Sequence, residues 1–406
     1  MEKLNFGIVG LGSRGVLCFG EMLKKRDDVT IAALCDTNSH RLEIAAGQLA
    51  PEAACYTDID AMFAGTQLDA VVITTPDYYH EECAVKAIRA NVNVLIDKPL
   101  ATTVKACRNI ISEAEKAGKV LMIGFNLRHH SVLKKVKELI DKGDLGRVFL
   151  MENREFYNGG RTYMSRWNRF YDQCGGLWIH KGSHDFDVFQ WLMGFPKPVK
   201  VSAFADISVL NENNLPFEVI EGIEPGPCCH KCHYKEQCPD VYLDVIKDDE
   251  NGPWSDKAAE LDGYVKDTCM YLSEKDNHDN GIAIVEYDNG ARASHMECFI
   301  NPASANDRRF TVVGTKAHLT ASLSDRKVVV RPRFGNEVIT YDIPEASGGH
   351  GGADPMLLAS FIDTVTGKKP NASTFEQGMW STAVGQAAEI ARREGRVVNV
   401  AELFED

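Results

Sequence analysis

A glycine motif near the N-terminus constrains the fold of this chain more than any other feature. An apolar run at residues 5–9 leads directly into Gly10-Leu-Gly12-Ser13-Arg14-Gly15, and apolar residues at helical spacing follow at 16–25. Glycines at this spacing permit a tight turn from strand to helix and a close approach of the backbone to a pyrophosphate. The start of the helix offers free N–H groups to those phosphates. The motif therefore predicts a dinucleotide site that includes Gly10, Gly12, Ser13, Arg14 and Gly15.

The residue that ends the next predicted strand supports the same interpretation. The strand at 31–35 leads into Asp36, which lies 21 residues after Gly15. A carboxylate at this place accepts hydrogen bonds from the adenosine ribose, and its charge repels the 2′-phosphate of NADP. We therefore expect NAD to be preferred over NADP. A glycine-rich turn that binds no ligand is the alternative.

The first 125 residues alternate short apolar runs with segments of helical periodicity. Further strands are expected at 70–73, 92–96 and 120–123, and further helices at 40–49, 79–90 and 104–117. This alternation is typical of a doubly wound parallel sheet. The sequence therefore predicts an α/β fold whose N-terminal domain, residues 1–125, is a Rossmann domain.

The character of the chain changes after residue 125. β-Rich segments at 147–156, 199–207, 281–287, 292–299, 310–314 and 327–331 are separated by turns, a pattern that suggests an antiparallel sheet. Helices are expected at 131–142, 183–192, 355–366 and 374–393. We expect residues 126–406 to form a second α+β domain, interrupted by a polar, cysteine-containing insertion at 211–278.

Charge and hydropathy exclude several classes of partner. The formal net charge of −13 argues against a nucleic acid, and no apolar stretch approaches the roughly 20 residues of a membrane span. The N-terminus lacks the pattern of a secretory signal. We therefore expect a cytoplasmic protein that binds a small molecule rather than a nucleic acid or a membrane.

Polar residues follow three of the predicted strands, at the edge where open parallel sheets bind ligands. They are Thr74, Thr75, Pro76 and His80 after the strand at 70–73, Asp97 and Lys98 after that at 92–96, and Asn126 and Arg128 after that at 120–123. We expect all of them except Arg128 to contact the cofactor, and Arg128 to contact the substrate. The alternatives are a surface histidine at position 80 and a solvated lysine at position 98.

Two histidines four residues apart, His180 and His184, lie at the entry to the helix expected at 183–192. Oxidation of a carbinol needs a base that titrates near neutral pH and a cation that stabilises the developing alkoxide. Histidine meets the first need, and Lys98 meets the second. We therefore predict Lys98, His184 and His180 as catalytic residues. A metal site and a structural role in the core are the alternatives for the histidine pair.

Residue types that commonly bind sugars occur near these histidines and before the last helices. Tyr163, Arg166 and Trp167 precede the histidines, Lys181 adjoins His180, and His350 precedes the helix at 355–366. Aromatic faces and arginine hydrogen bonds are usual in carbohydrate sites. We expect these five residues to contact the substrate. The alternatives are aromatic packing in the core and a Lys181 side chain that points to solvent.

Four of the twelve cysteines, Cys228, Cys229, Cys232 and Cys238, lie within eleven residues of the insertion. Their spacing fits a metal site, and a structural zinc would stabilise a segment that has no core of its own. We predict zinc bound by Cys229, Cys232 and Cys238, with Cys228, His230 or His233 as the fourth ligand. An iron–sulfur cluster, a disulfide and free thiols are the alternatives.

Taken in order, the segments GIVGLGSRG, TTPDYYH, IDKP, GGLWIHKGSHDFD and HGGAD resemble the glucose–fructose oxidoreductase/inositol dehydrogenase (Gfo/Idh/MocA) family. The resemblance implies a Rossmann domain followed by a domain built on an open, mostly antiparallel sheet. That sheet often carries an oligomer interface, so we expect a homo-oligomer, a dimer or a tetramer. The resemblance also implies that Lys98 contacts the reacting hydroxyl and that His184 matches the family's histidine, whereas His180 stands where the family has an aspartate.

The resemblance and the site residues together predict an NAD(P)-dependent dehydrogenase that acts on the CH–OH group of a sugar, cyclitol or glycoside. Some family members instead recycle the cofactor: they oxidise a glycoside at C3, eliminate or epimerise, and then reduce again. This is the alternative activity, and net release of NADH separates the two. A third reading is a non-catalytic NAD(H)-binding sensor, against which the set of Lys98 and two histidines argues.

Overall fold

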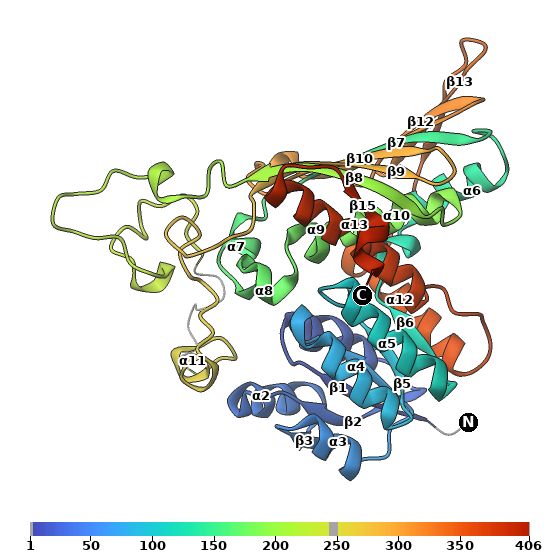
Figure 1. The fold of residues 1–406 in the computed structure, drawn as a ribbon. Helices are drawn as coiled ribbons and strands as arrows, with labels where there is room; N and C mark the ends of the chain where they lie inside the picture. Colours follow the sequence, from blue (N-terminus) through green and yellow to red (C-terminus); the bar gives the residue numbers. More distant parts are fainter. Residues whose placement is uncertain (1–2, 243–250, 406) are drawn as a thin grey trace.

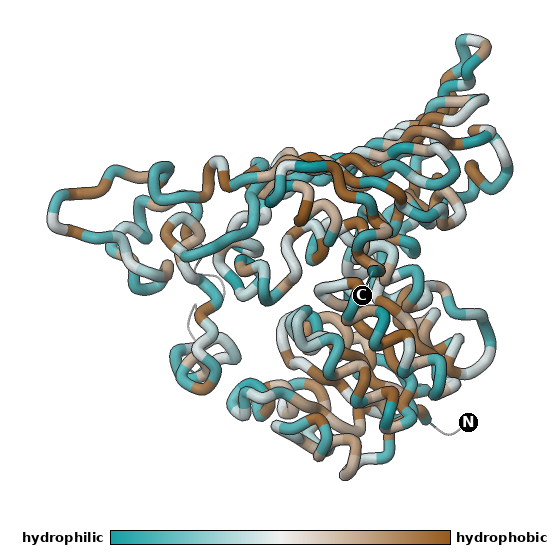
Figure 2. The backbone as a smooth tube through the Cα atoms, viewed as in Figure 1, coloured by the Kyte–Doolittle hydropathy of each residue, from teal (hydrophilic) through white to brown (hydrophobic). Residues whose placement is uncertain are grey.

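The computed structural model describes residues 3–242 and 251–405, which form two β-sheets with helices between them (Figure 1). Residues 243–250 of the predicted insertion lie outside the described residues. Among the described residues, no helix is long and apolar enough to cross a membrane. Apolar segments follow the strands of both sheets and the helices that separate them (Figure 2).

The N-terminal sheet contains six parallel strands in the order β3-β2-β1-β4-β5-β6. The strands are β1 (Leu4–Val9), β2 (Val29–Cys35), β3 (Ala54–Tyr56), β4 (Ala70–Ile73), β5 (Asn93–Ile96) and β6 (Leu121–Ile123). The order reverses between β1 and β4, so the carboxyl ends of these two strands flank the crevice where doubly wound sheets bind ligands. The predicted Rossmann fold is confirmed.

Helical segments connect these strands. They are η1 (Arg14–Gly20, a π-helical segment), α1 (Glu21–Lys24), α2 (Ser39–Leu49), α3 (Ile59–Gly65), η2 (Asp77–Tyr79), α4 (His80–Arg89), α5 (Val104–Ala117) and η3 (Asn126–His129). The strand expected at 70–73 and the helix expected at 104–117 have the expected bounds. The sequence pattern did not predict β3 or α3. β3 is a three-residue edge strand without a fully buried side chain, and such a strand carries no clear periodicity.

The second sheet contains nine strands in the order β14-β13-β12-β11-β7-β10-β9-β8-β15. The strands are β7 (Val148–Phe156), β8 (Pro198–Asp206), β9 (Asn280–Tyr287), β10 (Arg292–Cys298), β11 (Asp307–Gly314), β12 (Ala317–Ser322), β13 (Lys327–Pro332), β14 (Ile339–Asp342) and β15 (Val398–Asn399). Over the ranges that the structure describes, β7 and β10 form the one parallel pair of this sheet. The prediction of an open, mostly antiparallel sheet is confirmed, with β12, β14 and β15 as additional strands.

Helices cover one face of this sheet and line the space between the two sheets. The helical segments of this half are α6 (Ser131–Asp141), α7 (Gly160–Tyr163), η4 (Trp167–Arg169), α8 (Tyr171–Cys174), α9 (Leu177–His180), α10 (Ser183–Met193), η5 (Glu212–Asn214), η6 (Cys229–Lys231), α11 (Asp256–Asp262), η7 (Ala303–Ala305), α12 (Gly349–Val365), α13 (Phe375–Glu394) and η8 (Val400–Phe404). Residues of α6, α10 and α13 share one hydrophobic core with the inward-facing residues of the sheet. The segments α9 and α10, which contain His180 and His184, therefore pack beside α13 on the same side of the sheet.

Helix α12 packs against the N-terminal sheet, although it follows eight of the nine strands of the second sheet in the sequence. Leu357 and Phe361 of α12 are fully buried with Phe6 and Ile8 of β1. The rings of Phe6 and Phe361 meet edge to face, with their centroids 6.2 Å apart. The chain thus returns to its first strand, and this packing fixes the two halves relative to each other.

Helix α6 begins next to a buried histidine. His130 Nδ1 accepts a hydrogen bond from the backbone N–H of Val132 at 3.3 Å, which satisfies one of the free donors at the start of the helix. Burial, together with the positive charge of Arg308 and the nearby His350, lowers the pKa of His130 to about 4. His130 therefore stays neutral over the range in which a free histidine takes up a proton.

We predict that His130 contributes to loss of stability in acid. As the pH falls from 6.5 to about 4, the unfolded chain binds a proton that folded His130 does not, so the free energy of unfolding decreases by about 1.4 kcal/mol per pH unit. His130→Asn retains a cap acceptor that does not titrate. This variant should lose about 1.4 kcal/mol less of its free energy of unfolding per pH unit between pH 6.5 and 4 than wild type does. Its free energy of unfolding at neutral pH should be unchanged. Urea unfolding of both proteins across this range measures the effect, and an unchanged slope would contradict it.

Candidate active site

The glycine loop between β1 and η1 has a backbone that only glycine allows. Gly10 has φ +86°, and a Cβ there would lie 2.7 Å from the backbone N of Thr75. A Cβ on Gly15 would lie 2.0 Å from the carbonyl O of Gly10. Thr74 at the end of β4 donates from its Oγ1 to the same carbonyl at 2.6 Å. The loop is therefore folded tightly against the end of β4, as a pyrophosphate-binding turn requires.

Asp36 follows β2 and faces this loop. Its Oδ2 accepts from the backbone N of Leu11 at 2.7 Å, and its Oδ1 accepts from that of Asn38 at 2.9 Å. Arg41 in α2 lies 3.5 Å from Oδ1, so a cation stands beside the carboxylate. The sequence analysis did not single out Arg41, because its proximity to Asp36 depends on how α2 begins.

Arg14 joins the glycine loop to two other segments. It donates to Asp97 after β5 (Nε to Oδ2, 2.7 Å) and to Asp354 in α12 (Nη1 to Oδ2, 3.3 Å). Asp354 also accepts from Asn126 Nδ2 at 2.8 Å and lies 2.8 Å from His350 Nδ1. The structure therefore brings the predicted residues Arg14, Asp97, Asn126 and His350 together around Asp354, the last residue of the HGGAD segment.

His80 is buried, and its ring braces two loops. Its Nδ1 lies 2.7 Å from the carbonyl O of Pro99, and its Nε2 lies 3.1 Å from that of Thr75. The peptide bond between Lys98 and Pro99 is cis. With both ring nitrogens occupied by backbone oxygens, His80 positions the loops that follow β4 and β5. It is not the surface histidine of the alternative reading.

Lys98 crosses from the first sheet to the segment that carries the predicted histidines. Its Nζ donates to the carbonyl O of His180 at 2.6 Å. Burial lowers the pKa of Lys98, while Asp77 and Asp97 act in the opposite direction. No carboxylate forms an ion pair with Lys98 in the described part of the chain. Lys98 is therefore a partly buried amine whose one protein hydrogen bond among the described residues goes to a carbonyl oxygen rather than to a carboxylate.

His180 is paired with a carboxylate from the Rossmann domain that sequence reasoning missed. Its Nδ1 lies 2.6 Å from Oδ2 of Asp77, and since a carboxylate only accepts, Nδ1 carries the hydrogen. Its Nε2 lies 3.0 Å from Nδ2 of Asn168. Burial lowers the pKa of His180, and Asp77 partly offsets this effect. Asp77 belongs to the loop TTPDYYH, but no local pattern links it to a histidine 103 residues later.

His184 lies at the start of α10 and is buried without a hydrogen-bond partner for its Nδ1 among the residues described. Its ring lies 6.4 Å from that of His350. Burial, together with the charges of Lys98 and Arg308, holds the pKa of His184 well below its usual range. The imidazole is therefore neutral and free to accept a hydrogen bond or a proton from a ligand.

Three of the residues predicted to bind substrate flank these histidines. Trp167 and Tyr163 meet the ring of His180 edge to face, with centroids 5.3 and 5.9 Å away. Tyr163 also packs against Phe299. Arg166 reaches Tyr242 through its Nη2 at 3.2 Å, and its buried Nε has no partner within 3–242 and 251–405.

Two other predicted substrate residues have protein partners instead. Lys181 binds Glu155 at 2.8 Å. Burial by itself lowers the pKa of Lys181, but the charge of Glu155 outweighs it and the pKa is raised. Arg128 forms a bidentate pair with Asp187 (2.9 and 2.5 Å) and donates to the carbonyl O of Ala372. Their partners lie far away in the sequence, so these pairings were not predictable from local patterns.

The cysteine segment forms a small cluster around a buried aspartate. One ligand atom each from Cys228, His230 and Asp267 lies within 4.8 Å of the others. Cys232 Sγ accepts from the backbone N of Gly226 at 3.4 Å. None of the twelve cysteines, all of which lie within the described residues, forms a disulfide. The structure thus groups Cys228 with His230 and Asp267, whereas the sequence analysis placed Cys229, Cys232 and Cys238 first.

Two family models match the chain. That described as "Oxidoreductase family, NAD-binding Rossmann fold" matches residues 4–125, and "Oxidoreductase family, C-terminal alpha/beta domain" matches residues 137–400. A Bacillus subtilis (strain 168) protein named "Putative oxidoreductase YteT" is 29% identical over an alignment of 435 positions, which covers 99% of each chain. The myo-inositol 2-dehydrogenase of Thermotoga maritima is 29% identical over 214 positions, which cover 52% of this chain and 60% of that protein.

Solved structures share the fold at low sequence identity. The WlbA dehydrogenase from Bordetella pertussis, in complex with NADH and UDP-GlcNAcA, has a TM-score of 0.69 at 19% identity and covers 98% of this chain and 99% of its own. An oxidoreductase from Agrobacterium radiobacter, in complex with NAD+, L-tartaric acid and magnesium, has a TM-score of 0.71 at 16% identity and covers 99% of both. Because the two family models together span most of its length, this chain belongs to the Gfo/Idh/MocA oxidoreductase family and begins with an NAD-binding Rossmann domain.

Proposed function

We propose that this protein transfers a hydride between NAD and a hydroxyl-bearing carbon of a sugar, cyclitol or glycoside. The observation that carries the proposal is the meeting of Lys98, from the Rossmann domain, with the segment that holds His180 and His184. A buried cation and a buried neutral imidazole from two domains form a proton-transfer pair beside a dinucleotide-binding loop. The inositol dehydrogenases among the relatives support this substrate class.

The glycine loop fits a bound dinucleotide. Gly12 is open to its surroundings, since the nearest atom to a Cβ there would be the Trp254 ring at 3.9 Å, whereas Gly10 and Gly15 are tightly enclosed. Gly12, Ser13 and Arg14 would hold the phosphates, with Thr74, Thr75 and Pro76 beside them. NAD, when bound, supplies the hydride acceptor.

The protein's own side chains supply the base, the positive charge and the substrate contacts. His184, neutral and without a partner for Nδ1, accepts the hydroxyl proton of the substrate. Lys98 places a positive charge where the alkoxide develops. Tyr163, Trp167 and His350 flank the sugar. A buried ion-pair network supports these residues. Lys181 pairs with Glu155, and Arg308 joins Glu155 to Asp185 at the start of α10.

His180 acts in this proposal mainly as a positioning residue. It is also the second imidazole of the site that can exchange a proton. Asp77 fixes its tautomer and ring orientation, in the way that a buried carboxylate orients a catalytic histidine. The carbonyl O of the same residue holds the ammonium of Lys98. The Asp77–His180 pair thus replaces the aspartate that the family has at position 180.

A cofactor-recycling activity is the second candidate. One relative is named 2,7-anhydro-N-acetylneuraminate hydratase, from Mediterraneibacter gnavus, and is 27% identical over 48% of this chain. A hydration involves no net oxidation or reduction, so this name favours the cofactor-recycling candidate. The same residues would serve, because oxidation and re-reduction of one carbon use the same base and cation. NADH would then remain bound, and no net NADH would accumulate.

The outer face of the second sheet supports a homo-oligomer. Phe204 of β8 is 76% exposed, and Ile282 and Ile284 of β9 are 43% and 51% exposed. These side chains alternate with buried residues, so they lie on the face that α13 does not cover. An apolar sheet face of this kind is typical of a subunit interface.

We predict that Lys98→Met and His184→Asn each lower kcat by about 10²- to 10⁴-fold, while NAD affinity stays close to that of wild type. Steady-state assays by NADH absorbance across a screen of inositols, sugars and glycosides measure kcat, and single-turnover experiments on a substrate found in that screen measure the hydride-transfer step itself. Lys105→Met on the exposed face of α5 is the matched control. His180→Asn should give a milder defect if the residue only positions Lys98. Near-normal chemistry in both Lys98→Met and His184→Asn would overturn the proposed site.

We predict that NAD binds more tightly than NADP, because Asp36 repels a 2′-phosphate. Asp36→Asn should raise the affinity for NADP and narrow the difference between the two dinucleotides, since the repelling carboxylate is gone and Arg41, which also pairs with Asp262, lies 3.5 Å away. Arg41→Gln in the Asp36→Asn background should remove the gain. Calorimetry with both dinucleotides tests this, and equal affinities in wild type would show that Asp36 does not select the cofactor.

We predict that the cysteine segment binds zinc in near-stoichiometric amount in protein purified without added metal. Elemental analysis measures it, and Cys232→Ser should lose the metal while Cys55→Ser, which changes an exposed thiol of β3, keeps it. Asp267→Asn should lower the zinc content if the metal is bound by the Cys228–His230–Asp267 group. It should leave the zinc content unchanged if cysteines alone bind the metal. A metal-free, fully folded wild type rejects the prediction.

A further inference from the structure

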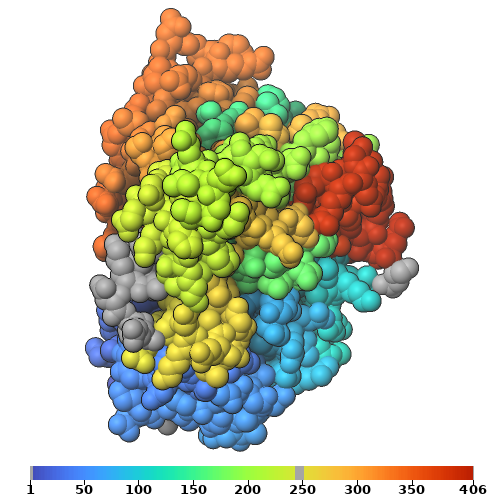
Figure 3. All heavy atoms as spheres, turned by 90° about the vertical axis from the view of Figure 1, so that its left-hand side faces the viewer, coloured from blue at the N-terminus to red at the C-terminus, as the bar shows by residue number. Residues whose placement is uncertain are grey.

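The insertion reaches back across the molecule and rests on the Rossmann domain. In Figure 3 its yellow part lies directly against the blue N-terminal domain. Arg41 in α2 forms an ion pair with Asp262 in α11 at 3.0 Å, and Asn38 donates to Asp262 at 2.8 Å and to the carbonyl O of Ala258 at 2.9 Å. His40 lies 2.8 Å from the carbonyl O of Asn251. The contact involves the first turn of α2, directly after Asp36.

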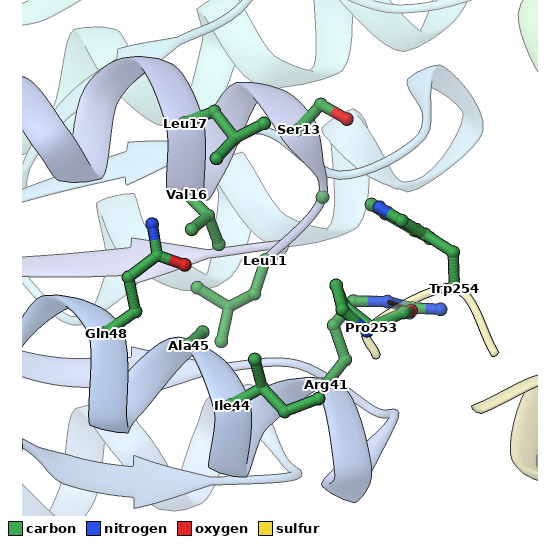
Figure 4. Close-up of a pocket in the computed structure, with 11 residues that line it drawn as sticks. Leu11, Ser13, Val16, Leu17, Arg41, Ile44, Ala45, Gln48, Pro253 and Trp254 are labelled. Carbon is green, nitrogen blue, oxygen red and sulfur yellow. Dashed lines mark hydrogen bonds between the residues drawn. The ribbon is translucent and has the colours of Figure 1, made fainter. Parts of the chain in front are cut away.

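This contact forms one wall of a pocket beside the glycine loop. The pocket is lined by Leu11, Gly12, Ser13, Val16, Leu17, Arg41, Ile44, Ala45, Gln48, Pro253 and Trp254 (Figure 4). Pro253 and Trp254 come from the insertion, and the other residues come from the loop, η1 and α2. The indole of Trp254 lies near Gly12 and over the guanidinium of Arg41, at 4.8 Å. The pocket therefore lies between the glycine loop, η1 and α2, and the insertion closes one side of it.

Lys266 of the insertion points at the same loop without a counter-ion. It is 7% exposed, its Nζ lies 3.2 Å from Ser13 Oγ and 3.9 Å from the centre of the Trp254 ring. No carboxylate pairs with it anywhere in the described segments. Arg166 and Arg41 are the charged groups nearest to it, and burial, together with these two cations, lowers its pKa to about 7.

A buried lysine surrounded by cations is unfavourable to the folded chain by itself. An anion placed between Lys266 and Ser13 would remove this repulsion and supply the missing partner. The first turn after a Rossmann glycine loop is where a pyrophosphate lies. The electrostatics therefore match a doubly negative group at the position where the fold would bind one.

We propose that residues 251–266 of the insertion close over the adenosine diphosphate half of NAD, with Lys266 as a ligand of the pyrophosphate and Trp254 as a wall of the adenosine pocket. This inference rests on the proposed use of NAD. It assigns to the insertion a role in cofactor binding, in addition to any metal site. A cofactor held in this way from both domains dissociates slowly.

The test compares Lys266→Met with Lys257→Met, which changes an exposed lysine of α11 in the same segment. Calorimetry should show that Lys266→Met lowers the affinity for NAD by about 10- to 100-fold. The affinity for ADP-ribose, which has the pyrophosphate but no nicotinamide, should fall by the same factor. Lys257→Met should bind both as wild type does. Trp254→Ala should speed NADH release in stopped-flow fluorescence. Higher salt should weaken NAD binding to wild type more than to Lys266→Met.

Thermal unfolding separates binding from a structural role. Without NAD, Lys266→Met should unfold at the same or a higher temperature than wild type, because it removes an unpaired buried charge. With NAD, its gain in Tm should be smaller than that of wild type. Unchanged affinity in Lys266→Met overturns the inference and leaves the hydride-transfer proposal standing. A loss of affinity that accompanies an equal loss of stability without NAD also overturns it, and a wild type that binds neither NAD nor ADP-ribose overturns both proposals.

Discussion

The arrangement of the cleft depends on one guanidinium group. Arg14 lies between Asp97 and Asp354, two buried carboxylates that could not remain ionised so close together without a cation. Burial by itself lowers the pKa of Arg14, but the two carboxylates outweigh it and raise the pKa. Asp354 in turn holds Asn126 and His350. The glycine loop, the ends of β5 and β6 and the start of α12 are therefore joined by a single charge cluster, and Lys98 directly follows Asp97, one of its members.

The sequence predicted the elements whose side chains obey a strong period. The strand at 70–73 and the helix at 104–117 match the structure because both are apolar on the faces they bury. The roles of individual polar residues were less accessible. Lys181 and Arg128 have the chemistry of substrate ligands, yet their partners Glu155 and Asp187 lie on other elements and take up that chemistry. Asp77 shows the reverse case, since its importance comes from His180, which only the fold brings to it.

The insertion shows why composition alone does not reveal what stabilises a polar segment. Residues 211–278 have too few apolar side chains for a core of their own, which suggested a metal as their main support. The structure shows a second support, because α11 and the residues before it use the first turn of α2 as their packing partner. A segment of this kind is stabilised by the domain it covers. Its residue types therefore reflect the surface it rests on, and Trp254 and Lys266 lie beside Gly12 and Ser13 of the glycine loop.

Two buried lysines without a carboxylate partner among the described residues mark the two ends of the site. Lys98 lies at the carboxyl end of β5, and Lys266 lies beside Ser13 at the glycine loop. Lys181, equally buried, has Glu155 and therefore serves the protein itself. Since an unpaired buried cation reduces stability, each of these two lysines is best explained by a negative charge that the ligands bring. In the proposed site, the alkoxide that develops on the substrate would be such a charge at Lys98, and the pyrophosphate of the cofactor would be one at Lys266. In the proposed site each domain therefore contributes to both ends: Lys98 and His184 act at the reacting carbon, and the glycine loop and Lys266 act at the cofactor. Both negative charges are present together only when cofactor and substrate are bound at once.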